Sequence, residues 1–326
     1  MENRDAEILK RHYELKPLKY QLLRQRGKRK VWYVQTNKGP FCFKRYNNPF
    51  ETYQFSFEGQ EYLINNGVKI PRLIRNKEGL FYSLGQKGTV YVLFEWISGS
   101  YPLKLNKKEH VIRCMESLAN FHKRGKGFIP SSPDLELERY RLNTNQEQRM
   151  LNELVQLNEK MRNQPPSVRK LIKEHHSWMV ERTKAGIDKL QEFMKGGDLQ
   201  EESKGRYIAH NDFADINVLL TRRDTYLIDF DDLTYNFPTV DVEQIFIKTA
   251  RHGIISPKDV ELWLSSYLKV FPLTKPLKGL LIQRLALPTI YYHLLTRLSN
   301  GGRTTPEQLS NTIQWEKGKY RVFSRL

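Results

Sequence analysis

The stretch HNDFADINVLLTRRDTYLIDFDD, from His210 to Asp232, decides the predicted fold. An acidic residue and an amide, Asp212 and Asn217, lie in a tight loop that precedes a short apolar strand expected at residues 218–220. A turn and a second strand at 226–228 follow, and this strand ends in carboxylates that begin with Asp229. We therefore expect Asp212, Asn217 and Asp229 to lie together at one edge of a hairpin.

Phosphoryl transfer needs a cluster of this kind. A carboxylate orients the attacking hydroxyl and accepts its proton, and hard oxygen ligands hold Mg²⁺. The same residues could also form an acidic turn between two core strands without any chemistry. The order and spacing of the whole stretch favour the chemical interpretation.

The chain is β-rich at first and helical afterwards. Two alternating segments, VWYVQT and FCFKRY, predict a hairpin over residues 31–46. One helix is expected in this part, from about residue 50 to the Asn66-Gly67 stop signal, and two more strands follow near 80–84 and 89–96. With 326 residues there is room for two cores. We therefore predict a β-rich lobe at 1–97 and a helical lobe at 98–326.

The spacing H-x-D-x-x-x-x-N, with an aspartate twelve residues later, resembles the catalytic and metal-binding loops of the protein-kinase-like superfamily. The wording HxDxxxxNVL and IDFDD is most similar to the aminoglycoside phosphotransferase and choline kinase branch. This resemblance implies an α+β, bilobal fold with a small antiparallel N-terminal sheet that binds nucleotide and a large helical lobe with the acceptor cleft. It implies ATP and Mg²⁺ as cofactors, Asp212 as the catalytic base, His210 as a brace of the loop, and Asn217 and Asp229 as metal ligands.

Lys44 interrupts the apolar strand FCFKRY with a charge. A lysine buried in a strand needs an anionic partner. The resemblance supplies nucleotide phosphates and a glutamate from the following helix as partners. We choose Glu58 for that glutamate, with Glu61, one turn further along, as the alternative.

Other segments fit the same resemblance. VLFEWISG, residues 92–99, is similar to the hinge, where the backbone of Glu95 and Ile97 would pair with the adenine edge. His122, in LANFH, is expected to be structural, and Asp241 is expected to support the backbone of the catalytic loop.

The segment LRQRGKRKV, residues 23–31, departs from this pattern. A loop whose backbone N–H groups approach phosphates usually needs several glycines, and this segment contains Gly27 alone. Arginine and lysine side chains could compensate through charge (Arg26, Lys28, Arg29 and Lys30).

Several segments together resemble the CotS family of spore-coat proteins of endospore-forming Bacilli: FCFKRY, GVKIPRLIRNKEGLFY, YVLFEWISG and LANFHKRGKGF. The resemblance covers nearly the whole chain. It implies synthesis in the mother-cell cytoplasm, deposition on the spore coat, and other coat proteins or an acidic assembly as partners.

The amino-acid composition narrows the classes of possible binding partner. The formal net charge of +18 favours attraction to polyanions, but no nucleic-acid-binding motif accompanies it, so nucleic acid ranks last. Cys42 and Cys114 lie far apart, which predicts neither a disulfide framework nor a zinc site. No apolar stretch approaches the length of a membrane span, so we expect no membrane insertion.

Two hypotheses for function remain open. The first is an Mg²⁺- and ATP-dependent kinase that acts on a hydroxyl group of an unknown acceptor. The second is a non-catalytic coat or assembly protein that uses the kinase fold as a scaffold. The four residues Lys44, Asp212, Asn217 and Asp229 favour the kinase, whereas the glycine-poor segment and the basic charge favour the scaffold.

Overall fold

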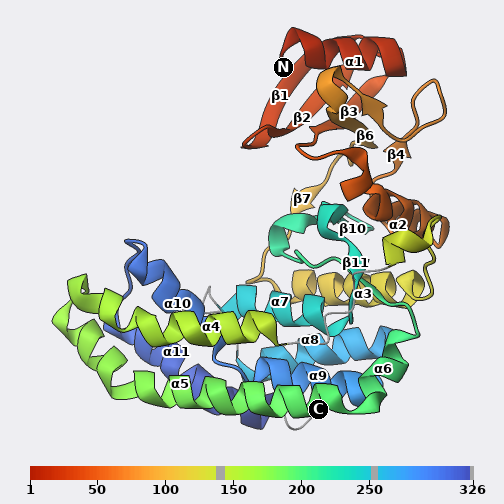
Figure 1. The fold of residues 1–326 in the computed structure, drawn as a ribbon. Coiled ribbons are helices and arrows are strands. Elements are labelled where there is room, and N and C mark those ends of the chain that lie inside the picture. Colours follow the sequence, from red (N-terminus) through yellow and green to blue (C-terminus); the bar gives the residue numbers. More distant parts are fainter. Residues whose placement is uncertain (137–143, 251–255, 324–326) are drawn as a thin grey trace.

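The computed structural model describes residues 1–136, 144–250 and 256–323, and it consists of a small lobe above a larger, mainly helical one (Figure 1). The small lobe contains a six-stranded sheet in the order β1-β2-β3-β6-β4, with β5 also paired to β6. Every strand pair in this sheet is antiparallel. The predicted α+β bilobal fold is therefore confirmed.

The strands of the small lobe follow the predicted alternation. In β2, the residues Trp32, Val34 and Thr36 are buried, whereas the residues between them are only partly covered. The hairpin predicted at residues 31–46 is confirmed as β2 and β3, which pair from Lys30 with Arg45 to Thr36 with Gly39. The strands of this sheet are β1 (Pro17–Arg26), β2 (Arg29–Thr36), β3 (Gly39–Arg45), β4 (Leu73–Ile74), β5 (Ser83–Leu84) and β6 (Val90–Glu95).

Two helices cover the sheet, although the sequence predicted only one. The predicted helix is α2 (Gln54–Asn65), which follows a short 3-10 turn and ends before Gly67, whose φ of 75° is left-handed. The helix that was missed is α1 (Asn3–Tyr13). It buries Leu9 against the face of the sheet that carries Trp32, while Phe57 of α2 packs on the opposite face.

The large lobe divides into two helical groups (Figure 1). Helices α4, α5, α10 and α11 extend away from the small lobe and share a hydrophobic core of their own. The other helices of the large lobe pack around the predicted catalytic loop, residues 210–217. The helices are α3 (Lys108–Gly125), α4 (Asn145–Leu157), α5 (Pro166–Lys195), α6 (Gly197–Ser203), α7 (Thr239–Ala250), α8 (Pro257–Val270), α9 (Lys275–Leu285), α10 (Thr289–Ser299) and α11 (Pro306–Phe323).

Short strands carry the predicted catalytic segment at the junction of the lobes. Strands β9 (Val218–Leu220) and β10 (Thr225–Leu227) form the expected hairpin, and β7 (Tyr101–Pro102) pairs with β9. Strand β8 (Ile208–Ala209), which precedes the catalytic loop, pairs with β11 (Thr234–Tyr235). The lobe boundary between residues 97 and 98 stays a prediction; it falls between β6 and β7.

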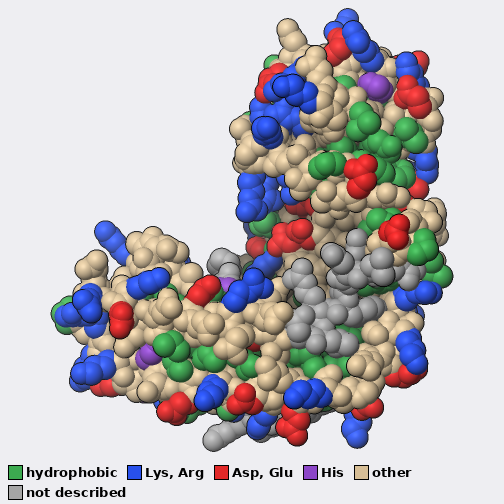
Figure 2. Space-filling model, viewed as in Figure 1, with side chains coloured by type: hydrophobic (Ala, Val, Ile, Leu, Met, Phe, Trp, Pro, Cys, Tyr) green, Lys and Arg blue, Asp and Glu red, His purple; other side chains and the backbone are tan. Residues whose placement is uncertain are grey.

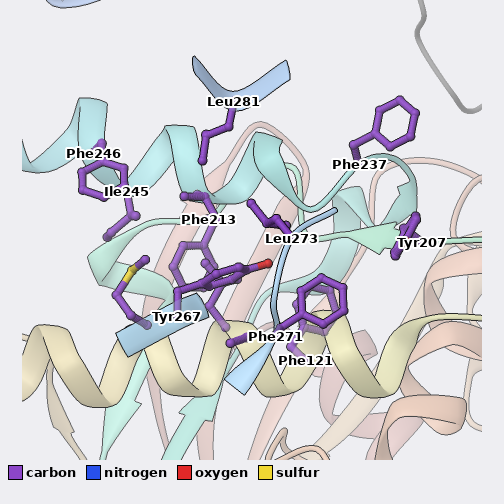
Figure 3. Close-up of a cluster of buried hydrophobic side chains, with 14 of the residues drawn as sticks. Phe121, Tyr207, Phe213, Phe237, Ile245, Phe246, Tyr267, Phe271, Leu273 and Leu281 are labelled. Carbon is purple, nitrogen blue, oxygen red and sulfur yellow. The ribbon is translucent and has the colours of Figure 1, made fainter. Parts of the chain in front are cut away.

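A cluster of aromatic and aliphatic side chains surrounds Phe213 of the predicted catalytic loop (Figure 3). Phe213, in the loop itself, is fully buried and points into this cluster beside Tyr267 of α8. Ile245 of α7 and Phe121 of α3 belong to the same core. The loop is thus fixed to three helices by hydrophobic burial, which is the main favourable contribution to folding.

None of the helices in the described ranges combines the length and the apolar character that a membrane span requires.

Candidate active site

The backbone of the catalytic loop is held by one buried carboxylate. Asp241, in the first turn of α7, is fully buried and accepts hydrogen bonds from the backbone N–H of His210 at 2.7 Å and of Asn211 at 2.9 Å. Its Oδ2 also lies 3.0 Å from His122 Nε2, and Nδ1 of the same ring lies 2.7 Å from the hydroxyl of Tyr267. The support expected from Asp241 and the structural position expected for His122 are both observed.

His210 connects the loop to the strand that leads to Asp229. Its ring is fully buried, and Nε2 donates to the carbonyl oxygen of Ile228 at 2.9 Å. Phe213 and Phe230 pack against the ring, with centroid distances of 5.8 and 4.8 Å. These contacts give His210 the geometry of a brace, with no exposed atom for chemistry.

Asp212 is accessible, whereas Asn217 is not. The side chain of Asp212 is 50% exposed, and its Oδ1 lies 3.3 Å from Nζ of Lys248, which also donates to the carbonyl of Phe213 at 2.7 Å. Asn217 is buried, and its Nδ2 donates to the carbonyl oxygen of Asp212 at 2.9 Å. Because the amide nitrogen is engaged, the oxygen of Asn217 is the atom that could bind a metal ion.

Asp229 and Asp231 form an anionic pair that three cations surround. Lys44 Nζ lies 2.6 Å from Asp229 Oδ1 and 3.3 Å from Asp231 Oδ1. Arg29 Nη2 lies 2.7 Å from Asp229 Oδ1 and 2.5 Å from Asp231 Oδ2, and Arg24 Nη1 lies 3.4 Å from Asp229 Oδ2. Asp231 and Arg24 were not singled out from the sequence.

These contacts keep Asp229 ionised. Burial opposes its charge, but Lys44 and Arg29 outweigh burial and lower the pKa of Asp229 far below its ordinary value. Asp229 also has left-handed backbone angles, φ 66° and ψ 55°, which a non-glycine residue rarely adopts. Such strain is retained mainly where the surrounding structure fixes a functional side chain.

The oxygen atoms present suit Mg²⁺ bound together with a nucleotide. In the ranges that the structure describes, no three His, Cys, Asp or Glu side chains are grouped so that they could hold a metal ion by themselves. Mg²⁺, however, commonly binds through one or two protein oxygen ligands plus phosphates and water. Asp229 and Asn217 fit that set, because one supplies an ionised carboxylate and the other an amide oxygen.

The predicted pairing of Lys44 with Glu58 is wrong. Glu58 instead accepts hydrogen bonds from the backbone N–H and the hydroxyl of Ser131, at 2.7 and 2.6 Å, and the alternative, Glu61, pairs with Arg75. The reason is the rotation of α2. Ser56 faces the site and donates to the carbonyl of Asp231 at 3.2 Å. Glu58 comes two residues later in the helix, so its side chain is rotated by about 200° from Ser56 and points away from the site.

The predicted hinge, residues 92–99, contains the end of β6 and the segment that leaves it. Phe94, at the end of β6, is 7% exposed, and its ring centroid lies 5.4 Å from Lys44 Nζ. The N–H of Glu95 donates to the carbonyl of Arg72 at 2.9 Å, so the carbonyl of Glu95 is the group that the predicted adenine contact would use. The contacts predicted for Glu95 and Ile97 with adenine stay predictions.

Two adjoining hollows surround the carboxylates. The smaller, of about 50 Å³, is lined by Asp212, Asp229, Asp231 and Asp232 from the large lobe and by Arg24, Arg26, Arg29 and Val31 from the β1–β2 hairpin. The larger, of about 560 Å³, shares Arg29, Asp231 and Asp232 with it and extends toward α4 and α7. Figure 2 shows basic and acidic side chains meeting at this junction of the lobes.

The wall of the larger hollow is polar. Glu147 Oε2 and Gln244 Oε1 are buried there without a hydrogen-bond partner among the described residues. Glu147 Oε1 lies 3.1 Å from Arg284 Nη1, which fixes the carboxylate. Both atoms are shielded from solvent in this structure, so they lie behind the surface of the hollow.

A family model and several solved structures match this chain. The model of the phosphotransferase enzyme family matches residues 21–254. An aminoglycoside phosphotransferase from Alicyclobacillus acidocaldarius superposes with a TM-score of 0.71 at 17% identity, over 93% of this chain and 90% of that one. A spectinomycin phosphotransferase in complex with ADP and spectinomycin gives 0.63 at 12% identity, over 98% and 96%.

An amicoumacin kinase, solved with AMP-PNP and Ca²⁺, gives a TM-score of 0.61 at 14% identity, over 98% of this chain and 95% of that one. At these identities the structural similarities show the kinase-like fold. The narrower resemblance to CotS proteins stays a prediction.

Proposed function

Because this chain belongs to the phosphotransferase enzyme family, we propose that it transfers the γ-phosphoryl group of ATP to a hydroxyl group of a polar acceptor. The observation that carries the proposal is the convergence of Asp212 and Asp229 on one hollow, with Lys44 bonded to Asp229 from the other lobe. A protein that no longer transferred phosphoryl groups would not need the exposed carboxylate of Asp212 beside the ionised carboxylate of Asp229.

Each residue has a distinct part in the proposed reaction. Asp212 accepts the proton of the acceptor hydroxyl as its oxygen bonds to the γ-phosphorus, and the bond to the β–γ bridging oxygen breaks to release ADP. Mg²⁺, held by Asp229 and Asn217, would neutralise charge on the phosphate oxygens. Lys44 would bind the same phosphates, and Lys248 holds the carboxylate of Asp212 in position through its contact at 3.3 Å.

The acceptor is expected in the larger hollow. Its volume of about 560 Å³ suits a small molecule, and its wall offers carboxylate and amide oxygens next to the catalytic loop. Burial and the nearby Asp231 and Asp212 raise the pKa of Asp232, which lies between the two hollows. This surplus of negative charge and hydrogen-bond acceptors favours an acceptor rich in hydroxyl or amino groups.

A scaffold of the spore coat is the second candidate. It is supported by the resemblance to CotS proteins and by the arginines of the β1–β2 hairpin, which pair with the carboxylates that would hold the metal ion. Under either candidate, we propose that the protein is made in the mother-cell cytoplasm and associates with the coat through its basic surface. A fluorescent fusion that remained in the mother-cell cytosol throughout sporulation would contradict this association.

Release of ADP from Mg·ATP, with water as the acceptor, tests the catalytic proposal without knowledge of the substrate. We expect slow ADP formation by the wild-type protein and its loss in Asp212→Asn. The matched control is Asp224→Asn, because Asp224 is an exposed aspartate on the same segment that pairs with Lys69 away from the site. Equal rates in the wild type and in Asp212→Asn would refute the role of Asp212, and the scaffold would then be the better account.

A further inference from the structure

The β1–β2 hairpin places two arginines beside Asp229. Arg29 is 24% exposed and bridges Asp229 and Asp231, and Arg24 approaches Asp229 from the neighbouring strand. Arg29 also lies 6.0 Å from the ring centroid of Tyr46, whose hydroxyl donates to Asp231 Oδ1 at 3.1 Å. Both guanidinium groups therefore contact Asp229, the carboxylate that the proposed metal ion would use.

The backbone of this hairpin is already committed to strand pairing. β2 lies between β1 and β3, so its N–H groups serve the two ladders. The turn consists of Gly27 and Lys28, between the paired residues Arg26 and Arg29, and Gly27 alone has a positive φ. A hairpin this tight cannot present the several free N–H groups with which a glycine-rich loop binds phosphates.

Local geometry directs selected basic side chains toward the site. A register shift between Leu22 and Arg24 marks a bulge in β1, and bulges change the direction of neighbouring side chains. Of the basic residues at 24–30, Arg24, Arg26 and Arg29 line the small hollow. Lys28 lines a different hollow, which residues of α1 also line, and Lys30 pairs with Glu2 at 2.7 Å. Lys28 and Lys30, which the sequence offered for charge compensation, therefore do not line the small hollow.

We infer that Arg29, assisted by Arg24, binds the β- and γ-phosphates of the nucleotide in place of a glycine-rich loop. The inference rests on the proposed function. Guanidinium groups bind carboxylates and phosphates with the same planar, two-pronged geometry, so Arg29 exchanges Asp229 and Asp231 for phosphate oxygens when ATP enters. Asp229 is released by the same exchange and becomes available to the metal ion.

Calorimetric titration of Mg·ATP and of AMP into the wild type and Arg29→Ala tests this inference. Loss of charge-assisted bonds predicts a fall in ATP affinity of about tenfold to a hundredfold. AMP lacks the β- and γ-phosphates, so its affinity should change by less than about twofold, within the usual effect of a surface substitution. Lys28→Ala, which removes a cation from the same hairpin outside the site, should leave both affinities unchanged.

Two further measurements separate phosphate binding from an indirect effect on Asp229. Titration of ATP in the presence of EDTA should show the same loss in Arg29→Ala, because a contact with phosphate does not require the metal ion. Arg29→Lys should recover only part of the affinity, since an ammonium group cannot bind two oxygens in one plane.

The binding results separate the proposed function from the role of Arg29. A wild-type protein that binds neither ATP nor AMP would overturn the proposed function and this inference together. Two results would overturn this inference alone, provided that the wild type binds ATP. In the first, Arg29→Ala binds ATP within threefold of the wild type. In the second, Arg29→Ala loses affinity for AMP by the same factor as for ATP.

Discussion

Replacement of Asp241 by asparagine should loosen the catalytic loop at its base. Oδ2 of Asp241 accepts from the N–H of His210 and contacts His122, and Oδ1 accepts from the N–H of Asn211. The single oxygen of an asparagine can replace Oδ2, but its NH₂ group would then face the N–H of Asn211. One charge-assisted hydrogen bond is lost and one buried donor remains unsatisfied.

The expected cost follows from these contacts. Hydrogen bonds to charged groups contribute about 1.5–3 kcal/mol each, and Asp241 is fully buried, so water cannot replace the lost acceptor. We expect the free energy of unfolding to fall by about 2–3 kcal/mol. Urea denaturation followed by circular dichroism measures it, with Asp224→Asn as the exposed control that should change by less than about 0.5 kcal/mol. A loss below about 1 kcal/mol in Asp241→Asn would refute the argument that this carboxylate holds the loop.

Three other predictions concern separate parts of the structure. Lys44→Met should weaken Mg·ATP binding at least about tenfold, because it leaves the carboxylate pair without its buried cation; an unchanged Kd would contradict this role. Gly125→Ala should lower the free energy of unfolding by about 1–3 kcal/mol, because the new Cβ would lie 2.8 Å from Ile208 Cγ1. The control is Gly197→Ala, whose Cβ meets no atom within 4 Å and should leave the free energy of unfolding unchanged. Burial lowers the pKa of His122 in the folded state despite the adjacent carboxylate, so the histidine of the unfolded state is protonated at a higher pH. The free energy of unfolding should therefore fall below about pH 6.5, by up to about 1.4 kcal/mol per pH unit. An equal fall in His122→Gln would contradict this.

The catalytic segment could be predicted because it is continuous in the sequence. Asp212, Asn217 and Asp229 lie on one loop and one hairpin, so local spacing determines that they meet. The β2–β3 hairpin was predictable for the same reason, since its alternating pattern indicates which residues the sheet buries.

Features that depend on rotation or distant packing were missed. The choice between the two faces of α2 required the direction in which Ser56 points, and spacing alone does not give it. The contacts of Arg24 and Arg29 with Asp229 join residues about two hundred positions apart and depend on strand register and on the approach of the two lobes. α1 lacks the usual start signal, because its N-cap is Glu2 and not Ser, Thr, Asp or Asn, although Glu2 and Asp5 form a capping box in the structure.

The central claim is that the junction of the lobes binds Mg·ATP through Asp229, and thermal unfolding tests it most directly. The midpoint should be measured with and without millimolar ATP and Mg²⁺, for the wild type and for Asp229→Ala. We expect the wild-type midpoint to rise more with ATP and Mg²⁺ together than with ATP alone, and we expect this Mg²⁺-dependent part to disappear in the variant, since a ligand that binds only the folded state stabilises it. An unchanged wild-type midpoint, or an equal rise in Asp229→Ala, would contradict the central claim.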